Sequence, residues 1–204
     1  MSTLLDGLDR LLKRITQSGC LAAGWALVIL SIVIALNVMA RKLFNYSIQG
    51  VDEYGGYCLA ICASIGFSQA AYDKAHVRIT VITDHLPERS RAYCDVFALL
   101  LLTFTAALLA SKSFDVAATS YAMQALATSS LRTPLVLPQA AWAASLCWFS
   151  LVLFIQLMRA CTKLAHHDWK GVSGEYGASS VDEEIEHELA MAKARLGADK
   201  GKML

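Results

Sequence analysis

The chain has 204 residues, of which 56% are hydrophobic and only 17% are charged. Soluble domains usually carry about a quarter charged residues, so this composition offers too few charged groups to cover a water-facing surface. The formal net charge of +1 gives no general attraction to nucleic acid, and no basic cluster with interleaved aromatic residues is present. The composition therefore indicates an all-α membrane protein that crosses the bilayer several times.

The first residues, 4–15, carry aliphatic side chains along one helical stripe, while charged residues fill the rest of the helix surface. This pattern predicts a short amphipathic helix that lies on the membrane surface before the chain turns inward. A coiled-coil contact is the alternative, which the short length of the repeat disfavours. The stripe consists of Leu4, Leu5, Leu8, Leu11, Leu12 and Ile15.

The first crossing is predicted at about residues 20–40, because no charge occurs between Arg14 and Arg41. The run is too long for the core of a signal peptide and lacks a convincing cleavage site, so we expect it to stay in the protein. Asn37 is its one strongly polar side chain near the end. We interpret Asn37 as an interhelical hydrogen-bonding group rather than a ligand.

The second crossing is predicted at residues 54–72, inside the stretch DEYGGYCLAICASIGFSQAAYDKAHVR. Two acids precede the apolar run and a charged cluster follows it, the pattern that a bilayer selects because a charge in hydrocarbon costs several kcal/mol. A helix of about 19 residues measures about 28 Å, close to the thickness of the hydrocarbon core.

Between the second and third crossings, alternating β-branched residues fit a strand, while a helical face fits the same residues. A lone strand beside lipid would leave its backbone unpaired, so we expect a helical or irregular segment on the membrane interface. His76 and Arg78 lie in this interfacial segment. A metal or proton-relay role for His76 is less favoured than interfacial hydrogen bonding. Pro87 marks the start of the next helix.

The third and fourth crossings are predicted within residues 96–126 and 138–158. Lys112 and Asp115 are spaced i, i+3, so they can neutralise each other at the membrane boundary. Pro134 or Pro138 suits the first turn of the fourth crossing, where a missing N–H costs nothing. Residues 1–165 thus form a predicted four-helix membrane domain.

Residues 166–204 form a predicted polar tail, in which a capping box at Ser180 and Glu183 indicates a short helix. An excess of basic residues on one side of the membrane places both termini in the cytoplasm. Basic residues on the cytoplasmic side are Arg10, Lys13, Arg14, Lys74, Arg78, Arg89, Arg91, Arg159, Lys163 and Lys170; the opposite side has Arg41, Lys42, Lys112 and Arg132.

The motifs of catalysis are absent from the sequence: no nucleophile–base pair, phosphate-binding glycine loop or zinc-binding H-E-x-x-H pattern occurs. Cys58 and Cys62 share a helix face, but no histidine or carboxylate in the apolar run would complete a metal site. We therefore expect no catalytic residue, no cofactor and no metal, and a membrane partner rather than a catalyst or a complete transporter.

Four motifs then follow in order: N-V-M-A-R-K-L-F, D-E-Y-G-G-Y, A-H-V-R-I-T-V with L-P-x-R, and T-P-L-x-x-P. Over about Leu21 to Met158 the chain resembles the small membrane subunit of tripartite ATP-independent periplasmic (TRAP) transporters, the DctQ-like family. The resemblance implies a location in the inner or cytoplasmic membrane of a bacterium or archaeon. It also implies a large DctM-like permease subunit and a periplasmic substrate-binding protein as partners.

In such systems the binding protein delivers an organic acid, a sodium gradient drives uptake, and the small subunit braces the large one. A free-standing membrane sensor or assembly factor that acts through its cytoplasmic tail is the alternative function. A membrane enzyme or redox subunit is a third possible function, and the absence of catalytic and metal-binding motifs from the sequence disfavours it.

Two groups of residues are candidate partner sites. The periplasmic charges are expected to shape the face on which the binding protein lands, or else to anchor helix ends; they are Arg41, Lys42, Asp52 and Glu53. Small residues in helical register admit close packing of another helix, either of the large subunit or within this chain; they are Gly55, Gly56, Ala60, Ala63 and Gly66.

Overall fold

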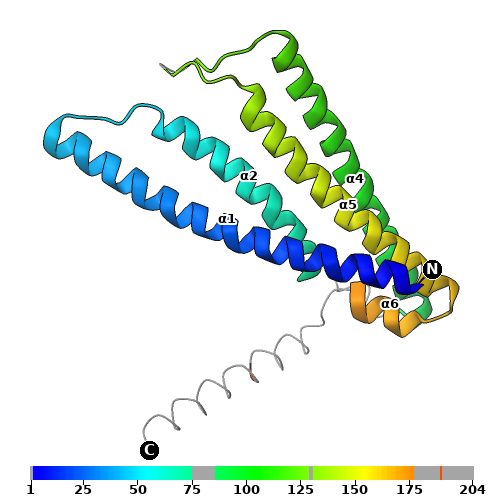
Figure 1. Cartoon of the computed structure of the whole chain (residues 1–204). Coiled ribbons are helices and arrows are strands. Elements are labelled where there is room, and N and C mark those ends of the chain that lie inside the picture. Colours follow the sequence, from blue (N-terminus) through cyan, green and yellow to red (C-terminus); the bar gives the residue numbers. More distant parts are fainter. Residues whose placement is uncertain (1, 75–85, 129–130, 177–188, 190–204) are drawn as a thin grey trace, which may run out of the picture.

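The computed structural model describes residues 2–74, 86–128, 131–176 and 189. Its helices are α1 (Ser2–Phe44), α2 (Val51–Tyr72), α4 (Glu88–Ala122), α5 (Val136–Ala165) and α6 (Trp169–Tyr176) (Figure 1). Within these ranges the extended structure is limited to one isolated bridge between Leu126 and Pro134. The predicted all-α fold is confirmed.

The four long helices form two antiparallel hairpins, α1 with α2 and α4 with α5. Helix α2 packs on α5, α1 touches α5 less extensively, and the short helix α6 lies against α4 and α5. In Figure 1 the hairpins converge at the end that holds the N-terminus and α6, and they diverge towards the other end. That convergence brings side chains from five helices close together.

Three of the described helices are long and apolar enough to cross a membrane: α1 (from Leu5), α4 and α5. Helix α2 has 22 residues, but its glycines, serines and Gln69 leave no stretch as apolar as those of the other three. The chain is therefore a multi-pass helical protein, while the crossing at residues 54–72 stays a prediction.

Helix α1 is a single helix of 43 residues, about 64 Å long at 1.5 Å per residue. The predicted turn between a surface helix and the first crossing is wrong for these residues. No proline interrupts residues 15–20, and the polar side of the first turns packs inward. Asp9 and Thr16 are buried, whereas Leu8, Leu11 and Ile15 are about half exposed. Leu12 is buried beside Asp9 and Thr16, so the apolar stripe is divided: Leu12 packs inward, and Leu8, Leu11 and Ile15 face outward.

The core lies between α4 and α5, where small residues of one helix meet large residues of the other. Alanines on α4 let the two backbones approach closely, as in other membrane helix pairs. Val172 and Tyr176 of α6 close this core at one end. Its buried members on α4 and α5 are Ala92, Val96, Leu99, Ala106, Phe149, Leu153, Leu157 and Ala160.

Prolines mark the helix starts as predicted. Pro87 is the residue before the first turn of α4, and Pro138 lies in the first turn of α5. Pro134 instead takes part in the isolated bridge within the α4–α5 connector (residues 123–135). Two backbone bonds hold this connector: Ala127 N–H to the Thr133 carbonyl (2.9 Å) and Leu135 N–H to the Ala125 carbonyl (3.1 Å).

The α1–α2 connector (residues 45–50) is held from inside its own hairpin. The buried Asn37 carboxamide oxygen accepts a hydrogen bond from the Ile48 N–H at 2.8 Å, so Asn37 serves the connector rather than another helix. Gly50 has φ 85°, and a Cβ there would lie 2.0 Å from the Leu131 Cδ1. Leu131 of the second connector therefore lies against Gly50 of the first.

Candidate functional site

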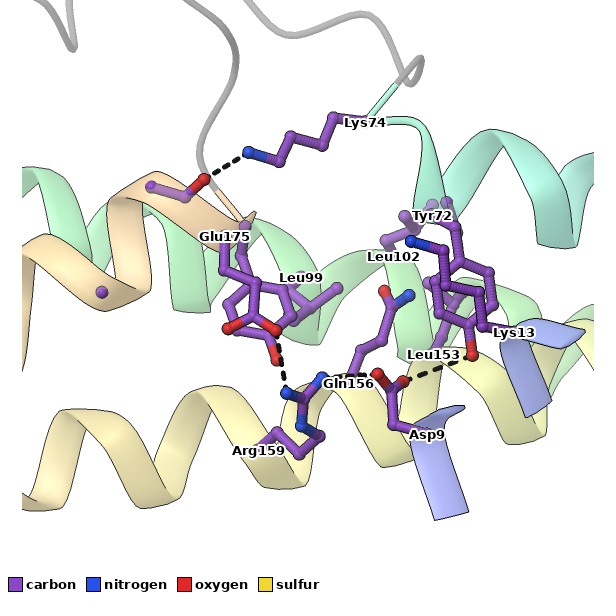
Figure 2. Close-up of a pocket in the computed structure, with 14 residues that line it drawn as sticks. Asp9, Lys13, Tyr72, Lys74, Leu99, Leu102, Leu153, Gln156, Arg159 and Glu175 are labelled. Atoms are coloured by element: carbon purple, nitrogen blue, oxygen red, sulfur yellow. Dashed lines mark hydrogen bonds and ion pairs between the residues drawn. The ribbon is translucent and has the colours of Figure 1, made fainter. Parts of the chain in front are cut away.

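The most concentrated polar site lies where the hairpins converge, around Arg159 of α5. Its guanidinium pairs with three carboxylates: Nε with Asp6 Oδ1 at 2.9 Å, Nη1 with Asp9 Oδ2 at 2.6 Å, and Nη2 with Glu175 Oε1 at 2.9 Å. The Arg159 side chain is only 14% exposed. We call Asp6, Asp9, Tyr72, Arg159, Lys163 and Glu175 the Arg159 cluster. Figure 2 shows four of its members, Asp9, Tyr72, Arg159 and Glu175.

Local sequence explains how one guanidinium reaches three acids. Asp6 and Asp9 are three residues apart, so they lie on one side of α1. Arg159 follows the apolar run of α5, and its planar group presents five N–H donors. A buried charge is tolerated only when it is paired and hydrogen-bonded. The cluster meets this condition, most completely for Asp9, whose side chain is 12% exposed.

Neighbouring hydrogen bonds tie further helices to the cluster. The Tyr72 hydroxyl at the end of α2 donates to Asp9 Oδ1 at 3.3 Å. One to two turns further along α1, Thr16 accepts a bond from the Trp148 indole N–H at 3.0 Å. Helices α1, α2, α5 and α6 are thus fixed to one another at this end.

Helix α6 is a short helix within the predicted polar tail. Its start is set by Asp168, whose carboxylate accepts the Gly171 N–H at 3.0 Å, and the local sequence D-W-K-G is the signal that could have indicated this cap. Ser173 donates to Asp95 at 3.1 Å, and the Lys163 ammonium pairs with Glu175. The helix therefore carries Glu175 to Arg159.

Tyr176, the last residue of α6, stays neutral beside these charges. Burial is the main cause that raises the pKa of its hydroxyl, and the adjacent Glu175 carboxylate raises it further. The phenol consequently contributes packing and hydrogen-bonding capacity to the cluster without adding a negative charge to it.

A cavity of about 500 Å³ opens beside the cluster, between α1, α2, α4, α5 and α6. Its polar wall includes Lys13, Tyr72, Lys74, Gln156 and Glu175, which Figure 2 shows around the same space. Its floor is apolar and consists of Ala71, Leu99, Leu102 and Leu153. The site therefore combines charged groups with an aliphatic surface.

The predicted periplasmic charges lie at the opposite end, around the α1–α2 connector. Arg41 and Lys42 are in the last turn of α1, and Asp52 and Glu53 are in the first turn of α2. Arg41, Lys42 and Asp52 are exposed, and among the described residues none of the three has an ion-pair partner. Glu53 accepts a hydrogen bond from the Tyr57 hydroxyl at 2.9 Å. The four charges therefore border the α1–α2 connector on both sides, as candidates for contact with another molecule.

The small residues of α2 fall on two faces. Gly55 is buried against α1, where a Cβ would lie 3.6 Å from Leu30 Cδ1. Gly56, Ala60 and Ala63 are exposed, and Gly56 also lines a groove between α2 and α1. Gly66 is half-buried, yet a Cβ there would meet no atom within 4 Å. Close packing against α1 within the chain is thus clearest for Gly55, while Ala60 and Ala63 present exposed small side chains.

Other packing in the α1–α2 hairpin involves cysteine. The Cys62 thiol donates to the Ala23 carbonyl (3.6 Å), and the Cys58 and Cys62 sulfurs lie 3.9 Å apart. The predicted Lys112–Asp115 ion pair is confirmed at 3.0 Å. His76 and Arg78 lie outside the described residues, as does the tail helix predicted after Ser180 apart from Leu189.

Long apolar helices packed as two hairpins define a multi-pass membrane protein. Residues 30–163 match the family model described as "Tripartite ATP-independent periplasmic transporters, DctQ component". This match covers more than half of the chain, which therefore belongs to the DctQ family and is a TRAP transporter small permease subunit by family. It includes Arg159 but ends before Glu175 and begins after Asp6 and Asp9.

A Haemophilus influenzae protein is also similar to the chain. It is 27% identical over 129 residues, which are 63% of this chain and 77% of the relative. Its name assigns it, by inference, as a TRAP transporter small permease protein. The resemblance seen in the sequence motifs is confirmed at the level of the family.

Proposed function

We propose that this chain braces a larger permease subunit during sodium-coupled uptake of an organic acid that a periplasmic protein delivers. The observation that carries the proposal is the large apolar surface that the chain leaves open along α1. Trp25, Ile29, Ile32 and Leu36 are each between 55% and 63% exposed. A helix that packs so little against its own chain has its surface available for lipid and for a partner subunit.

The bracing role is supported by the way the two hairpins are joined. At one end the Arg159 cluster links α1, α2, α5 and α6 through charged hydrogen bonds. At the other end Leu131 lies against Gly50. A unit tied at both ends resists changes in the angle between its hairpins, which suits a static support for a moving partner.

We infer that the chain crosses the membrane four times, and that α2 crosses it in addition to α1, α4 and α5. Helix α2 runs beside α1 and packs on α5, so it lies at the same depth as two helices that are apolar enough to cross. Its 22 residues span about 33 Å, which matches the hydrocarbon core. An even number of crossings keeps both termini on one side, and the basic residues place that side in the cytoplasm.

Reporter fusions test this topology. Fusions after Gln49 and after Leu131 should behave as periplasmic, and a fusion after Glu88 as cytoplasmic. The opposite pattern would reverse the orientation. A periplasmic signal after Glu88 together with one after Gln49 would remove α2 from the membrane and leave three crossings.

The outward face of α2 is the proposed contact with the large, DctM-like permease. Gly56, Ala60 and Ala63 allow another helix backbone to approach, and close approach is what drives helix association in lipid. Ala63→Leu should therefore weaken copurification of the large permease with the tagged chain, and uptake should fall with it. The chain should still insert, because leucine makes the helix more apolar.

The matched control is Ala107→Leu, the same change at an exposed position of α4. It should leave the complex intact. Loss of uptake in Ala63→Leu with the complex intact would assign this face to the transport movement instead of to assembly. Absence of any copurifying large permease from the wild-type chain would favour the free-standing sensor or assembly factor.

A further inference from the structure

The cavity beside the Arg159 cluster has features of a ligand site that the bracing role does not use. The first is Gln156, which lies one turn before Arg159 on α5 and is only 5% exposed. Its carboxamide forms no hydrogen bond with any residue that the structure describes, and Figure 2 shows it directed into the cavity. The amide therefore faces the cavity with its hydrogen-bonding groups available to a ligand.

The second feature is the balance of charge around the cavity. The carboxylates of Asp9 and Glu175 are both paired with Arg159. Lys13 and Lys74 also line the cavity, and within the described ranges neither has a carboxylate partner. The Lys13 ammonium lies 5.9 Å from the centre of the Tyr72 ring, and the Lys74 ammonium donates to the Gly174 carbonyl. The surplus charge is positive and therefore suits an anion.

The third feature is the floor, which is aliphatic although the walls are charged. Leu99 and Leu153 lie beneath it and are almost completely buried, so the accessible apolar surface comes from Ala71 and Leu102. A small inorganic ion would gain nothing from this surface, whereas an amphipathic anion would bury part of its chain there. The cavity also lies where the apolar run of α5 ends at Arg159, a position that matches the polar headgroups of a bilayer.

We propose that this cavity binds the headgroup of an anionic phospholipid. The phosphate diester accepts hydrogen bonds from Lys13 and Lys74, the Gln156 amide supplies a further donor, and the glycerol and first acyl carbons cover Ala71 and Leu102. The inference uses the proposed membrane position of this end but does not depend on transport or on the large permease. A bound lipid would join α1, α2 and α5 through one ligand.

Native mass spectrometry of the full chain in detergent, alone or with any copurifying permease, tests the proposal. Delipidated protein is titrated with phosphatidylglycerol or phosphatidylcholine, and its melting temperature is followed in parallel. Wild type should retain phosphatidylglycerol in preference to phosphatidylcholine and melt at a higher temperature with it. Lys13→Ala with Lys74→Ala should weaken this binding by more than about tenfold, because two charge-assisted hydrogen bonds are lost and one alone accounts for about tenfold.

Gln156→Leu separates binding from folding. Without lipid it should melt no lower than wild type, because it removes an unpaired buried amide, yet it should lose much of the increase that phosphatidylglycerol gives. Arg41→Ala with Lys42→Ala is the matched control: it removes two cations from the opposite end and should bind like wild type.

Three results would overturn the proposal. Equal binding by the lysine variants and wild type would place the lipid elsewhere. Equal effects of the two lipids would remove the need for an anionic headgroup. Stabilisation by inorganic phosphate alone, without lipid retention, would assign the cavity to a soluble anion.

Discussion

The two ends of this molecule treat their charges in opposite ways. At the converging end, Arg159 is largely buried and pairs with carboxylates from two other helices. At the connector end, Arg41, Lys42 and Asp52 are exposed and unpaired within the described ranges. A buried charge is stable only with its partners, whereas an exposed charge contributes little to stability and is available to another molecule. The first end therefore maintains the architecture, and the second is the better candidate for recognition.

The largest effect should follow from breaking the buried end. Arg159→Ala removes the guanidinium and leaves the Asp9 carboxylate, 12% exposed, without its counter-charge. Breaking a buried pair in this way typically costs about 3–5 kcal/mol, so we expect a marked fall in the melting temperature of the purified protein. Arg159→Lys keeps the positive charge but loses the planar guanidinium with its several N–H donors. Its melting temperature should therefore lie between those of wild type and Arg159→Ala. A melting temperature unchanged in Arg159→Ala would show that the cluster does not hold the hairpins together.

A smaller effect is expected at Gly50, where the two connectors meet. Gly50 has φ 85°, and an added Cβ would also collide with Leu131. Gly50→Ala should destabilise by about 1–2 kcal/mol in thermal melting, because a side chain is disfavoured at positive φ. Gly56→Ala is the control: it lies within α2 with no atom near the new methyl group, so stability should be unchanged or slightly higher. Equal behaviour of the two variants would exclude a structural role for the Gly50–Leu131 contact.

Sequence reasoning recovered the features that depend on neighbours along the chain. The Lys112–Asp115 pair spans three residues, and Pro87 and Pro138 act through their own backbone geometry. The long apolar runs likewise predicted the helices. Each of these follows from local rules that need no knowledge of the fold.

Features that depend on distant partners were missed. Asp9 and Arg159 are 150 residues apart, and the sequence around either residue gives no indication that the other is its partner. The polar side of residues 4–15 was interpreted as facing water for the same reason, so a surface helix and a turn were predicted where α1 continues. Helix α6 had a local signal in Asp168, but its role depends on Glu175 reaching Arg159.

The smallest effect on stability should come from the connector end, where the charges are exposed. Variants there also test the proposed recognition role most sharply. Asp52→Lys with Glu53→Lys reverses two charges beside the α1–α2 connector, and exposed charges usually change stability by no more than about 0.5 kcal/mol. Charges at the rim of an interface mainly alter the rate of encounter and its dependence on salt. The variant should therefore fold normally but receive substrate more slowly from its binding protein.

The decisive measurement is the initial rate of sodium-driven organic-acid uptake into proteoliposomes that contain this chain and its large permease. The binding protein is supplied outside, and the rate is followed as ionic strength rises. We expect uptake to require this chain, and we expect a lower rate with an altered salt dependence in the Asp52→Lys, Glu53→Lys variant. Identical rates and salt dependence in both proteins, at equal expression, would contradict a recognition role for this end. Uptake that proceeds without the chain would contradict the proposed function itself.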